Sequence, residues 1–440
     1  MKTIYFLFIC LSLSFNATFA QKGGIFGDNG EFLWILEDSV LTVSGNGVMP
    51  RFSYSGCVIH SSPWYYQDDI KSIVIEYGIS GLGYYAFYNC KNMRDVVFSR
   101  YGGVPSTVQD ISNAFVDCTS LTDITIPENV TNISGAFKGC KNLTSAYIAD
   151  NITNMTDAYG GCTGIANIDV SETHPLFYSQ DGIVYSKDLS LIQYPAGKQG
   201  SFTIPQSQVN SIAGGAFDGC EGLIGIIIPN SVTDIECYAF VNCSELTDIV
   251  IPEEIKEIKN STFSGCTKLT NITLPSELEK IRERAFESCT SLKQIIIPKN
   301  VVAISYHAFY HCTSLQKVEV QWETPLVIYN DLYESTMLMP CSPVRASSDD
   351  YDSPFYEVPV SSATLIVPDG TKELYQSADV WKEFGTIIEK SETAIENVAD
   401  TPANPIGYYN LQGQQLTCEP EYGVYIIRYD DGTAKKTLKE

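Results

Sequence analysis

The chain has 440 residues, with 28 lysines and arginines against 52 aspartates and glutamates, which gives a net charge of −24. This charge argues against nucleic acid or an anionic membrane surface as a partner, because both attract basic faces. Apolar residues make up 44% of the chain, which is enough for a packed core and argues against global disorder. The 14 cysteines need an explanation, since they could form disulfides, bind metal or pack inside the core.

The first 20 residues have the pattern of a secretory signal peptide. Lys2 precedes an apolar stretch over residues 4–15, and Thr18 and Ala20 supply small side chains ahead of a cleavage site between Ala20 and Gln21. The apolar stretch is shorter than the roughly 20 residues that span a bilayer, and we predict no transmembrane segment elsewhere. The mature protein is therefore expected to be exported to a compartment that permits disulfides.

Residues 21–70 are predicted to form a small β unit. Alternating apolar residues over 32–36 and 40–45 indicate two strands. The segment precedes a long repeat array, whose first coil would otherwise expose its apolar core to water. We therefore interpret residues 21–70 as an N-terminal β cap.

A repeat of 22 or 23 residues dominates residues 71–325. Nine cysteines mark it, with spacings of 28, 22, 22, 58, 23, 23, 23 and 23, and an aromatic residue lies three positions before each of them. A fixed period of this length is typical of a solenoid. The cysteines are Cys90, Cys118, Cys140, Cys162, Cys220, Cys243, Cys266, Cys289 and Cys312, and the aromatic residues are Phe87, Phe115, Phe137, Tyr159, Phe217, Phe240, Phe263, Phe286 and Phe309.

Each part of the repeat has a structural role. An apolar alternation that ends in proline, such as Ile295 to Pro298, indicates a short strand that stops because proline lacks an N–H. The Ala-Phe-x-x-Cys segment places Phe, Cys and a following Leu on one side of a short helical turn. Most residues directly before the cysteines are Gly, Asn or Asp, which tolerate positive φ, so a tight corner is expected there.

Stacked coils would share one core and turn the cysteines into it. We interpret the nine cysteines as small buried packing residues. Disulfides between adjacent coils are an alternative in an oxidising compartment, and a metal site is a weaker one because no Cys-x-x-Cys pair occurs. Cys57, Cys237, Cys341 and Cys418 lie outside the ladder and are the candidates for separate chemistry.

An insert interrupts the array. The 58-residue spacing between Cys162 and Cys220 places it at about 171–205. Strand-like stretches over 182–185 and 191–194, with turn residues beside them, predict a β-hairpin that protrudes from the array.

Three segments follow the array. Residues 326–392 are predicted to close the second end as a C-terminal cap, and residues 393–404 form a polar linker. Residues 405–440 are predicted to form a small β module, with strands over 408–414 and 423–429.

The unit L-x-x-I-x-I-P-x-x-V-x-x-I-x-x-x-A-F-x-x-C resembles the BspA-like leucine-rich repeats of bacterial surface and secreted proteins. Residues 363–375 are similar to the strand–turn–helix ending of that family. The resemblance implies a right-handed leucine-rich repeat solenoid, mostly β with short helical turns, of about nine to ten coils of 22–23 residues. It also implies recognition at a cell surface, including adhesion to host matrix proteins.

The C-terminal module resembles the sorting domain of type IX secretion. This resemblance implies a Gram-negative source, with the protein outside the cell or on its outer surface. A small β appendage without sorting activity is the alternative.

Candidate catalytic and metal-binding groups are few. His307 and His311 are four residues apart, which suits a metal on one turn, but both fall at variable repeat positions and are interpreted as structural. Asp349, Asp350 and Asp352 suit either calcium or a solvated acidic loop. The sequence has no G-x-S-x-G, H-E-x-x-H or P-loop motif, so we predict no catalytic residues, metal or cofactor.

We therefore predict a secreted or cell-surface recognition protein, without enzyme activity. Its partner would be a host matrix protein, another cell surface or a glycan, anchored on exposed tyrosines. A structural envelope spacer is one alternative. A glycan-processing accessory or hydrolase that uses the insert or the C-terminal cap is another, since unassigned loops can host sites.

Overall fold

The computed structural model describes most of the chain. The described residues are 22–52, 61–206, 208–327, 353–396, 405–409, 415–416, 419, 423–429 and 434–439. The predicted signal peptide with Ala20 and Gln21, three of the isolated cysteines (Cys57, Cys341 and Cys418) and the acidic cluster at 349–352 lie outside them.

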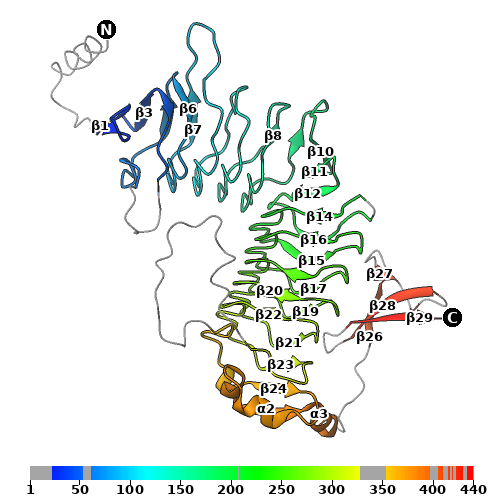
Figure 1. Cartoon of the computed structure of the whole chain (residues 1–440). Coiled ribbons are helices and arrows are strands. Elements are labelled where there is room, and N and C mark those ends of the chain that lie inside the picture. The colour runs from blue at the N-terminus through cyan, green and yellow to red at the C-terminus, as the bar shows by residue number, and fades with distance from the viewer. Residues whose placement is uncertain are drawn as a thin grey trace. The chain divides into compact units, whose positions relative to one another are not determined.

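The chain divides into two compact units. The first comprises Met1–Leu143 and Asn151–Asn154, and the second comprises Thr144–Asp150 and Met155–Glu440. Both consist of β-coils stacked through short strands (Figure 1), with about 13 turns in all. The prediction of nine to ten coils is therefore too low, because it rested on the coils that contain a ladder cysteine.

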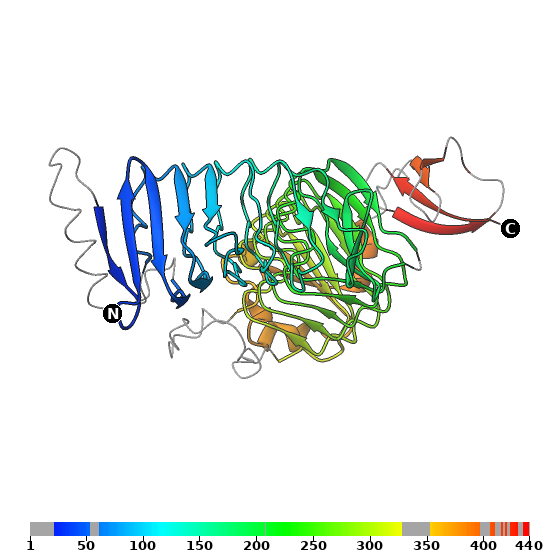
Figure 2. The ribbon, with the colours of Figure 1, turned by 90° about the horizontal axis from the view of Figure 1, so that it is seen from above.

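A five-stranded sheet forms the start of the first unit. Its order is β1-β2-β3-β5-β7, and the strands lie side by side in Figure 2. β1 and β2 are antiparallel, as are β2 and β3, whereas β3 pairs with β5 and β5 with β7 in parallel. The strands are β1 (Lys22–Phe26), β2 (Phe32–Glu37), β3 (Val40–Gly45), β5 (Ser72–Ile75) and β7 (Asp95–Phe98), and a second pair is β4 (Gly47–Val48) with β6 (Ile79–Gly81).

The second unit stacks two series of strands, one for each apolar stretch of the repeat. The I-x-I-P series contains β13 (Gly200–Thr203), β15 (Leu223–Ile227), β17 (Asp248–Val250), β19 (Asn271–Thr273), β21 (Gln294–Ile297) and β23 (Lys317–Val320). The V-x-x-I series contains β14 (Ser211–Ile212), β16 (Asp234–Ile235), β18 (Glu257–Ile258), β20 (Lys280–Ile281) and β22 (Ala303–Ile304). The unit begins with the parallel pair β8 (Tyr147–Ile148) and β9 (Asp169–Val170).

The insert forms a hairpin, but the hairpin does not protrude. β11 (Ile183–Ser186) and β12 (Ser190–Gln193) are antiparallel, β10 (Phe177–Gln180) pairs with β11, and β12 joins β14 in parallel. Val184 and Leu191 are fully buried. The predicted protrusion is therefore wrong: both faces of the hairpin carry apolar residues, and β12 takes a place in the stacked sheet.

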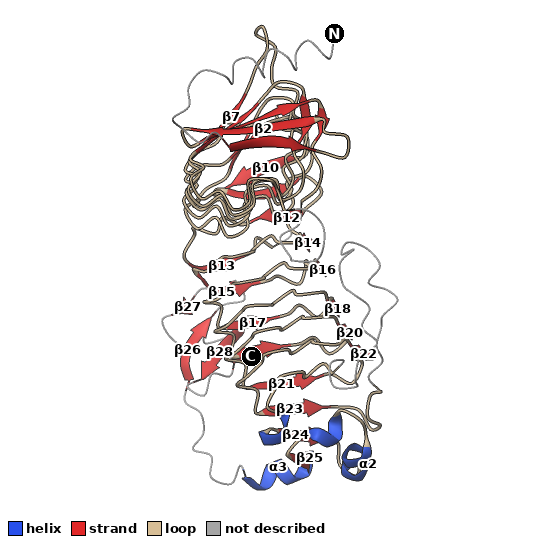
Figure 3. Cartoon of the chain, turned by 90° about the vertical axis from the view of Figure 1, so that its left-hand side faces the viewer, coloured by secondary structure: helices blue, strands red, loops and turns tan. Residues whose placement is uncertain are grey.

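The second unit ends in a short mixed segment where its helices gather (Figure 3). β24 (Thr364–Val367) and β25 (Thr386–Glu389) extend the sheet of β21 and β23 in parallel. Around them are η2 (Val360–Ser362), α2 (Lys372–Ser377), η3 (Trp381–Glu383) and α3 (Lys390–Glu396). Helix α3 covers the start of the predicted 393–404 linker, and the ion pairs Lys390–Glu319 and Lys372–Glu392 join it to β23 and to α2.

The C-terminal module is a four-stranded antiparallel sheet of order β27-β26-β28-β29. Its strands are β26 (Pro405–Tyr409), β27 (Gln415–Leu416), β28 (Gly423–Tyr429) and β29 (Ala434–Lys439). The strand predicted over 423–429 is present as β28.

The corner of each coil is a run of tight turns. Within residues 61–206 and 208–327 these corners contain no α-helix, so the expected short helical turns are hydrogen-bonded turns instead. The residue before each ladder cysteine has positive φ, as the repeat pattern predicts. A second positive-φ residue lies five positions before every ladder cysteine, for example Tyr85, Ser261 and His307. Two left-handed residues four apart stop a helix from propagating.

Aromatic rings stack along the interior of the corners. In the second unit the ring centroids of Phe217, Phe240, Phe263, Phe286 and Phe309 are 4.8–5.6 Å apart, with planes within 14° of parallel. All five rings are fully buried. This column is the centre of the core that the coils share, because each ring packs on the coil before and the coil after.

Three further aromatic residues extend these columns and explain the higher coil number. Trp64 stacks on Phe87 at 5.5 Å, Tyr194 on Phe217 at 5.1 Å, and Phe355 on Phe309 at 5.3 Å. Three positions after each stands Gln67, Gly197 or Val358 where other coils have cysteine. A count of cysteines therefore misses these coils, which lie in the predicted caps and insert.

Candidate functional site

The ladder cysteines act as buried hydrogen-bond donors. Seven of them donate from Sγ to the carbonyl oxygen of the aromatic residue in the preceding coil, at 3.1–3.8 Å. Every cysteine among the described residues is a free thiol. The structure therefore assigns the ladder to packing and hydrogen bonding, where cysteine combines a small apolar side chain with a weak donor.

Burial keeps these thiols neutral. It raises the pKa of Cys90 and of Cys312 to about 12, and it raises the pKa of Cys289 well above the usual value. A thiolate is the reactive and metal-binding form of cysteine, so ladder thiols are poor nucleophiles. Cys237 is half-buried outside the ladder, and burial raises its pKa as well.

The histidines are structural parts of the coils. His307 occupies the positive-φ position five residues before Cys312, and its ring stacks on Tyr310 and Tyr356 at 5.1 and 5.2 Å. His311 occupies the positive-φ position directly before Cys312, and its Nε2 lies 2.7 Å from Glu357 Oε2. Among the described residues, no group of three or more His, Cys, Asp or Glu side chains is placed to hold a metal ion.

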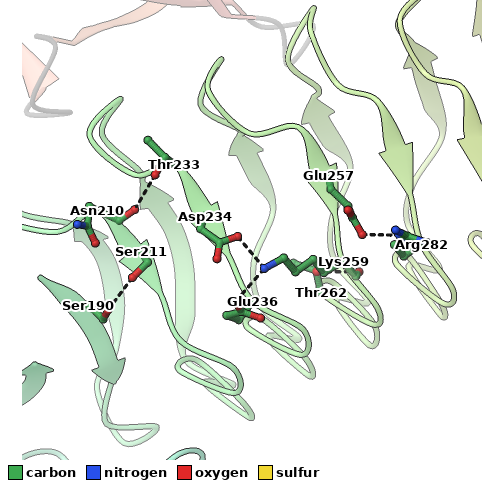
Figure 4. A network of polar contacts seen from close by, with 10 residues as sticks. All are labelled: Ser190, Asn210, Ser211, Thr233, Asp234, Glu236, Glu257, Lys259, Thr262 and Arg282. Carbon is green, nitrogen blue, oxygen red and sulfur yellow. Dashed lines mark hydrogen bonds and ion pairs between the residues drawn. The ribbon is translucent and has the colours of Figure 1, made fainter. Parts of the chain in front are cut away.

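An ion-pair network crosses the V-x-x-I series of the second unit (Figure 4). Lys259 Nζ lies 2.7 Å from Asp234 Oδ1 and 2.9 Å from Glu236 Oε1, and Arg282 pairs with Glu257. Burial lowers the pKa of Lys259, but hydrogen bonds to the two carboxylates outweigh it and leave the pKa raised. Each pair joins neighbouring coils, so the network holds the stack in register rather than forming a reactive site.

The outward positions of the I-x-I-P series carry exposed aliphatic residues. Val250 is 60% and Ile296 is 50% exposed, with Thr273 between them in the strand order. At the starts of β17 and β19, Asp248 accepts a hydrogen bond from Asn271 Nδ2 at 2.9 Å. Single exposed aliphatic residues are common on soluble proteins and identify no site by themselves.

The first unit carries a group of surface tyrosines, which we call the tyrosine patch. Tyr85 and Tyr88 make an edge contact at 5.7 Å, Tyr88 stacks with Tyr65 at 6.4 Å, and Tyr65 contacts Tyr66 at 4.9 Å. Tyr66 is 82% exposed. Tyrosines in mutual contact lose little side-chain entropy on binding and offer both an apolar ring and a hydroxyl, so they suit an interaction surface.

A hollow of about 240 Å³ is lined partly by residues that directly precede Tyr85 of the tyrosine patch in the sequence. We call it the Gly81 hollow. Its lining comes from three successive coils and includes Val48, Arg51, Gly81, Tyr84, Asp110 and Ser112. The guanidinium carbon of Arg51 lies 4.4 Å above the centre of the Tyr84 ring. None of these residues was predicted from the sequence as a site, because the repeat pattern identifies inward positions and not the residues that face solvent.

The repeats also identify the family. A model of the BspA type leucine rich repeat region matches residues 58–181 and 193–316 in six copies, which together cover more than half of the chain. The chain belongs to the BspA-type leucine-rich repeat family. No curated protein matches it significantly. Proteins of this family are typically secreted or located at the cell surface. Membership supports a role in protein interaction through the repeats.

Three solved structures are similar to this BspA-type protein, and the first of them supports the fold. The pneumococcal vaccine antigen PcpA has 18% identity and a TM-score of 0.50, over 83% of this chain and 98% of that one. A leucine-rich cell surface protein from Faecalibacterium prausnitzii has 27% identity and a TM-score of 0.45, over 68% of this chain and 94% of that one. A leucine-rich repeat protein from Eubacterium ventriosum has 23% identity and a TM-score of 0.43, over 68% of this chain and 96% of that one.

None of the helices in the described part of the chain has the length and the apolar character that crossing a bilayer requires.

Proposed function

We propose that this BspA-type protein is exported and recognises a partner outside the cell, on a host matrix protein or another cell surface. The observation that carries the proposal is the contrast between the constant interior and the variable corner of the coils. In the coils that a ladder cysteine marks, the inward ring position is aromatic, whereas the residue two positions earlier changes in type and is at least partly exposed in several coils, as in Tyr85, Tyr238 and Arg284. Such a scaffold keeps its fold while its surface chemistry is free to vary.

The interior supports a non-catalytic role. The buried thiols of the ladder are neutral and engaged with backbone carbonyls, so they supply no nucleophile. The histidine and carboxylate pairs in the described coils join neighbouring coils to each other. Recognition then depends on outward side chains, such as those of the tyrosine patch in the first unit.

Export and anchoring complete the proposal. The signal peptide over residues 1–20 would direct export, and the β module at 405–440 would act as a sorting domain that is removed or retained at the surface. Fractionation of cells that produce the full chain, with mass spectrometry of both termini, tests these steps. A protein that stays in the cytoplasm with Met1 intact would contradict them.

Binding to immobilised partners tests recognition itself. The purified mature chain is applied to surfaces of matrix proteins and of whole cells, at several salt concentrations. We expect saturable binding to at least one surface, and weaker binding when Tyr65 and Tyr66 are replaced by serine together. Saturable binding to none of the surfaces would refute the proposed function.

A further inference from the structure

We propose that the free edge of β1 binds an extended segment of the partner, which has apolar residues in its middle and a basic residue at each end. The segment pairs with β1 as an added strand. This inference rests on the proposed function and names the chemistry of the partner. Three observations support it: an unpaired edge, two partly exposed apolar side chains beside it, and carboxylates at both of its ends.

Strand β1 is the outermost strand of the first sheet. All five of its residues pair with β2 in one antiparallel register, from Lys22 with Leu36 to Phe26 with Phe32. Its other edge pairs with no strand among the described residues. In an antiparallel pair only alternate residues direct their N–H and C=O groups to the partner, so β1 has further groups that face away from β2. Such an edge is a template for another strand.

The edge lacks the features with which proteins usually protect edge strands, which are proline, a bulge or an outward charge. Strand β1 contains no proline and no bulge, and Gly23 and Gly24 in its middle have no side chain. Its one charged residue, Lys22, is the first residue of the strand and pairs with Asp69 Oδ2 at 3.8 Å. An approaching backbone therefore meets no charged side chain along the middle of β1.

Apolar side chains remain partly exposed on both faces of β1. Ile25 is 55% exposed. Phe26 points to the opposite face, where its ring contacts Trp64 at 5.3 Å, and it is also partly exposed. The residues of an added strand alternate between the same two faces, so apolar residues in the middle of the segment would cover both Ile25 and Phe26.

The charges at the two ends of β1 favour a basic segment. Asp28 is exposed in the turn that follows Phe26. At the other end, Asp69 lies beside Lys22, and Glu37 and Asp38 follow the residue that pairs with Lys22. Lys22 offsets one of these four carboxylates. A basic residue at each end of the segment is therefore attracted, whereas an acidic segment is repelled.

The edge of β1 adjoins the tyrosine patch. Lys22 Nζ donates to Gln67 Oε1 at 2.5 Å, and Gln67 directly follows Tyr66. A partner whose extended segment pairs with β1 can therefore place neighbouring residues on the exposed ring of Tyr66. The two features would then act as one binding surface on the first unit.

The test measures binding of the labelled peptide Lys-Lys-Val-Ile-Val-Lys-Lys to the mature chain by fluorescence polarisation. Hydrogen exchange read by mass spectrometry locates the contact. We expect saturable binding and slower exchange over residues 22–26, because the new hydrogen bonds protect backbone amides. A peptide with glutamate in place of every lysine, and one with proline in place of isoleucine, should each bind at least tenfold more weakly.

Matched variants test the position of the site. Ile25→Lys should reduce peptide affinity at least tenfold, because it places a charge in the middle of the edge and removes an apolar contact. Val97→Lys makes the same change at a residue of similar exposure, 50%, on β7, and should leave binding unchanged. Both side chains are exposed, so neither variant should lower the unfolding temperature.

A third variant tests the charges. Glu37→Gln combined with Asp38→Asn should weaken peptide binding severalfold and reduce its dependence on salt. Asparagine tolerates the positive φ of position 38, so the turn between β2 and β3 should keep its shape.

Other outcomes overturn the inference. Equal binding of the glutamate peptide would contradict the charge argument. Unchanged exchange over residues 22–26, or unchanged binding in Ile25→Lys, would place the peptide elsewhere. A dimer of the mature chain in sedimentation, lost in Ile25→Lys, would assign the edge to a second copy. If the chain binds matrix proteins or cells but not the peptide, the inference fails while the proposed function stands. If it binds the peptide at β1 but no matrix protein or cell, the proposed function fails instead.

Discussion

The stacked aromatic column makes a quantitative prediction for Phe263→Ala. Phe263 is fully buried, and its ring lies 5.4 Å from Phe240 and 5.6 Å from Phe286, with planes 10° and 8° from parallel. Truncating a buried Phe to Ala costs about 3–5 kcal/mol, through lost apolar contact and the cavity left behind. Because Phe263 is fully buried between two stacked rings, we expect a loss of about 4 kcal/mol, in the middle of this range.

Phe263→Leu separates ring stacking from volume. Leucine keeps most of the apolar volume but removes two aromatic pairs, each worth about 0.5–1.5 kcal/mol. We therefore expect a loss of about 2 kcal/mol for this variant. Comparing the two losses shows how much of the ring's contribution to the free energy of unfolding comes from stacking and how much from filling space.

The assay combines urea unfolding of the mature chain with hydrogen exchange read by mass spectrometry. Each coil contacts only its neighbours, so lost protection should centre on the coils that contain Phe240 and Phe286. Protection in the first unit, for example around Phe115, should not change. A loss below about 1 kcal/mol for Phe263→Ala, or protection lost evenly along the chain, would refute the nearest-neighbour description of the core.

Three further predictions concern the thiols, the ion-pair network and a glycine contact. Iodoacetamide at pH 8 should modify Cys237 well before Cys312 in the native protein, as peptide mass spectrometry would report; equal rates would contradict burial of the ladder. Since unfolded thiols ionise near pH 9.0 and burial raises the pKa of Cys312 to about 12, the urea unfolding free energy should fall as the pH rises above 9. Lys259→Met should destabilise by no more than about 1 kcal/mol and by less in high salt, because the pairs are partly exposed; a loss above 3 kcal/mol would show a larger role. Gly219→Ala should destabilise by more than about 2 kcal/mol, because its Cβ would lie 2.4 Å from a neighbouring backbone, whereas Gly370→Ala, with positive φ but open space, should cost about 1 kcal/mol in a thermal melt; equal shifts would rule out the contact.

The sequence by itself determined the repeat and the interior of each coil. Every ladder cysteine must sit at the same inward place, so the spacing of 22 or 23 residues reports the coil directly. The small or polar residues before the cysteines, such as Gly139 and Asn242, predicted the positive φ that the structure has there. The conflict between His311 as a metal ligand and as a corner residue was resolved by the same alignment of coils.

Only the tertiary structure decided what each coil contacts. Tyr194 and Phe355 enter the aromatic column without a cysteine beside them, so stacking, which depends on position in space, identified those coils while the motif did not. The second positive-φ position is occupied by residues as different as Tyr85 and Arg284, and no residue type marks it. The lining of the Gly81 hollow comes from three successive coils, so the hollow becomes visible only when neighbouring coils are placed against each other.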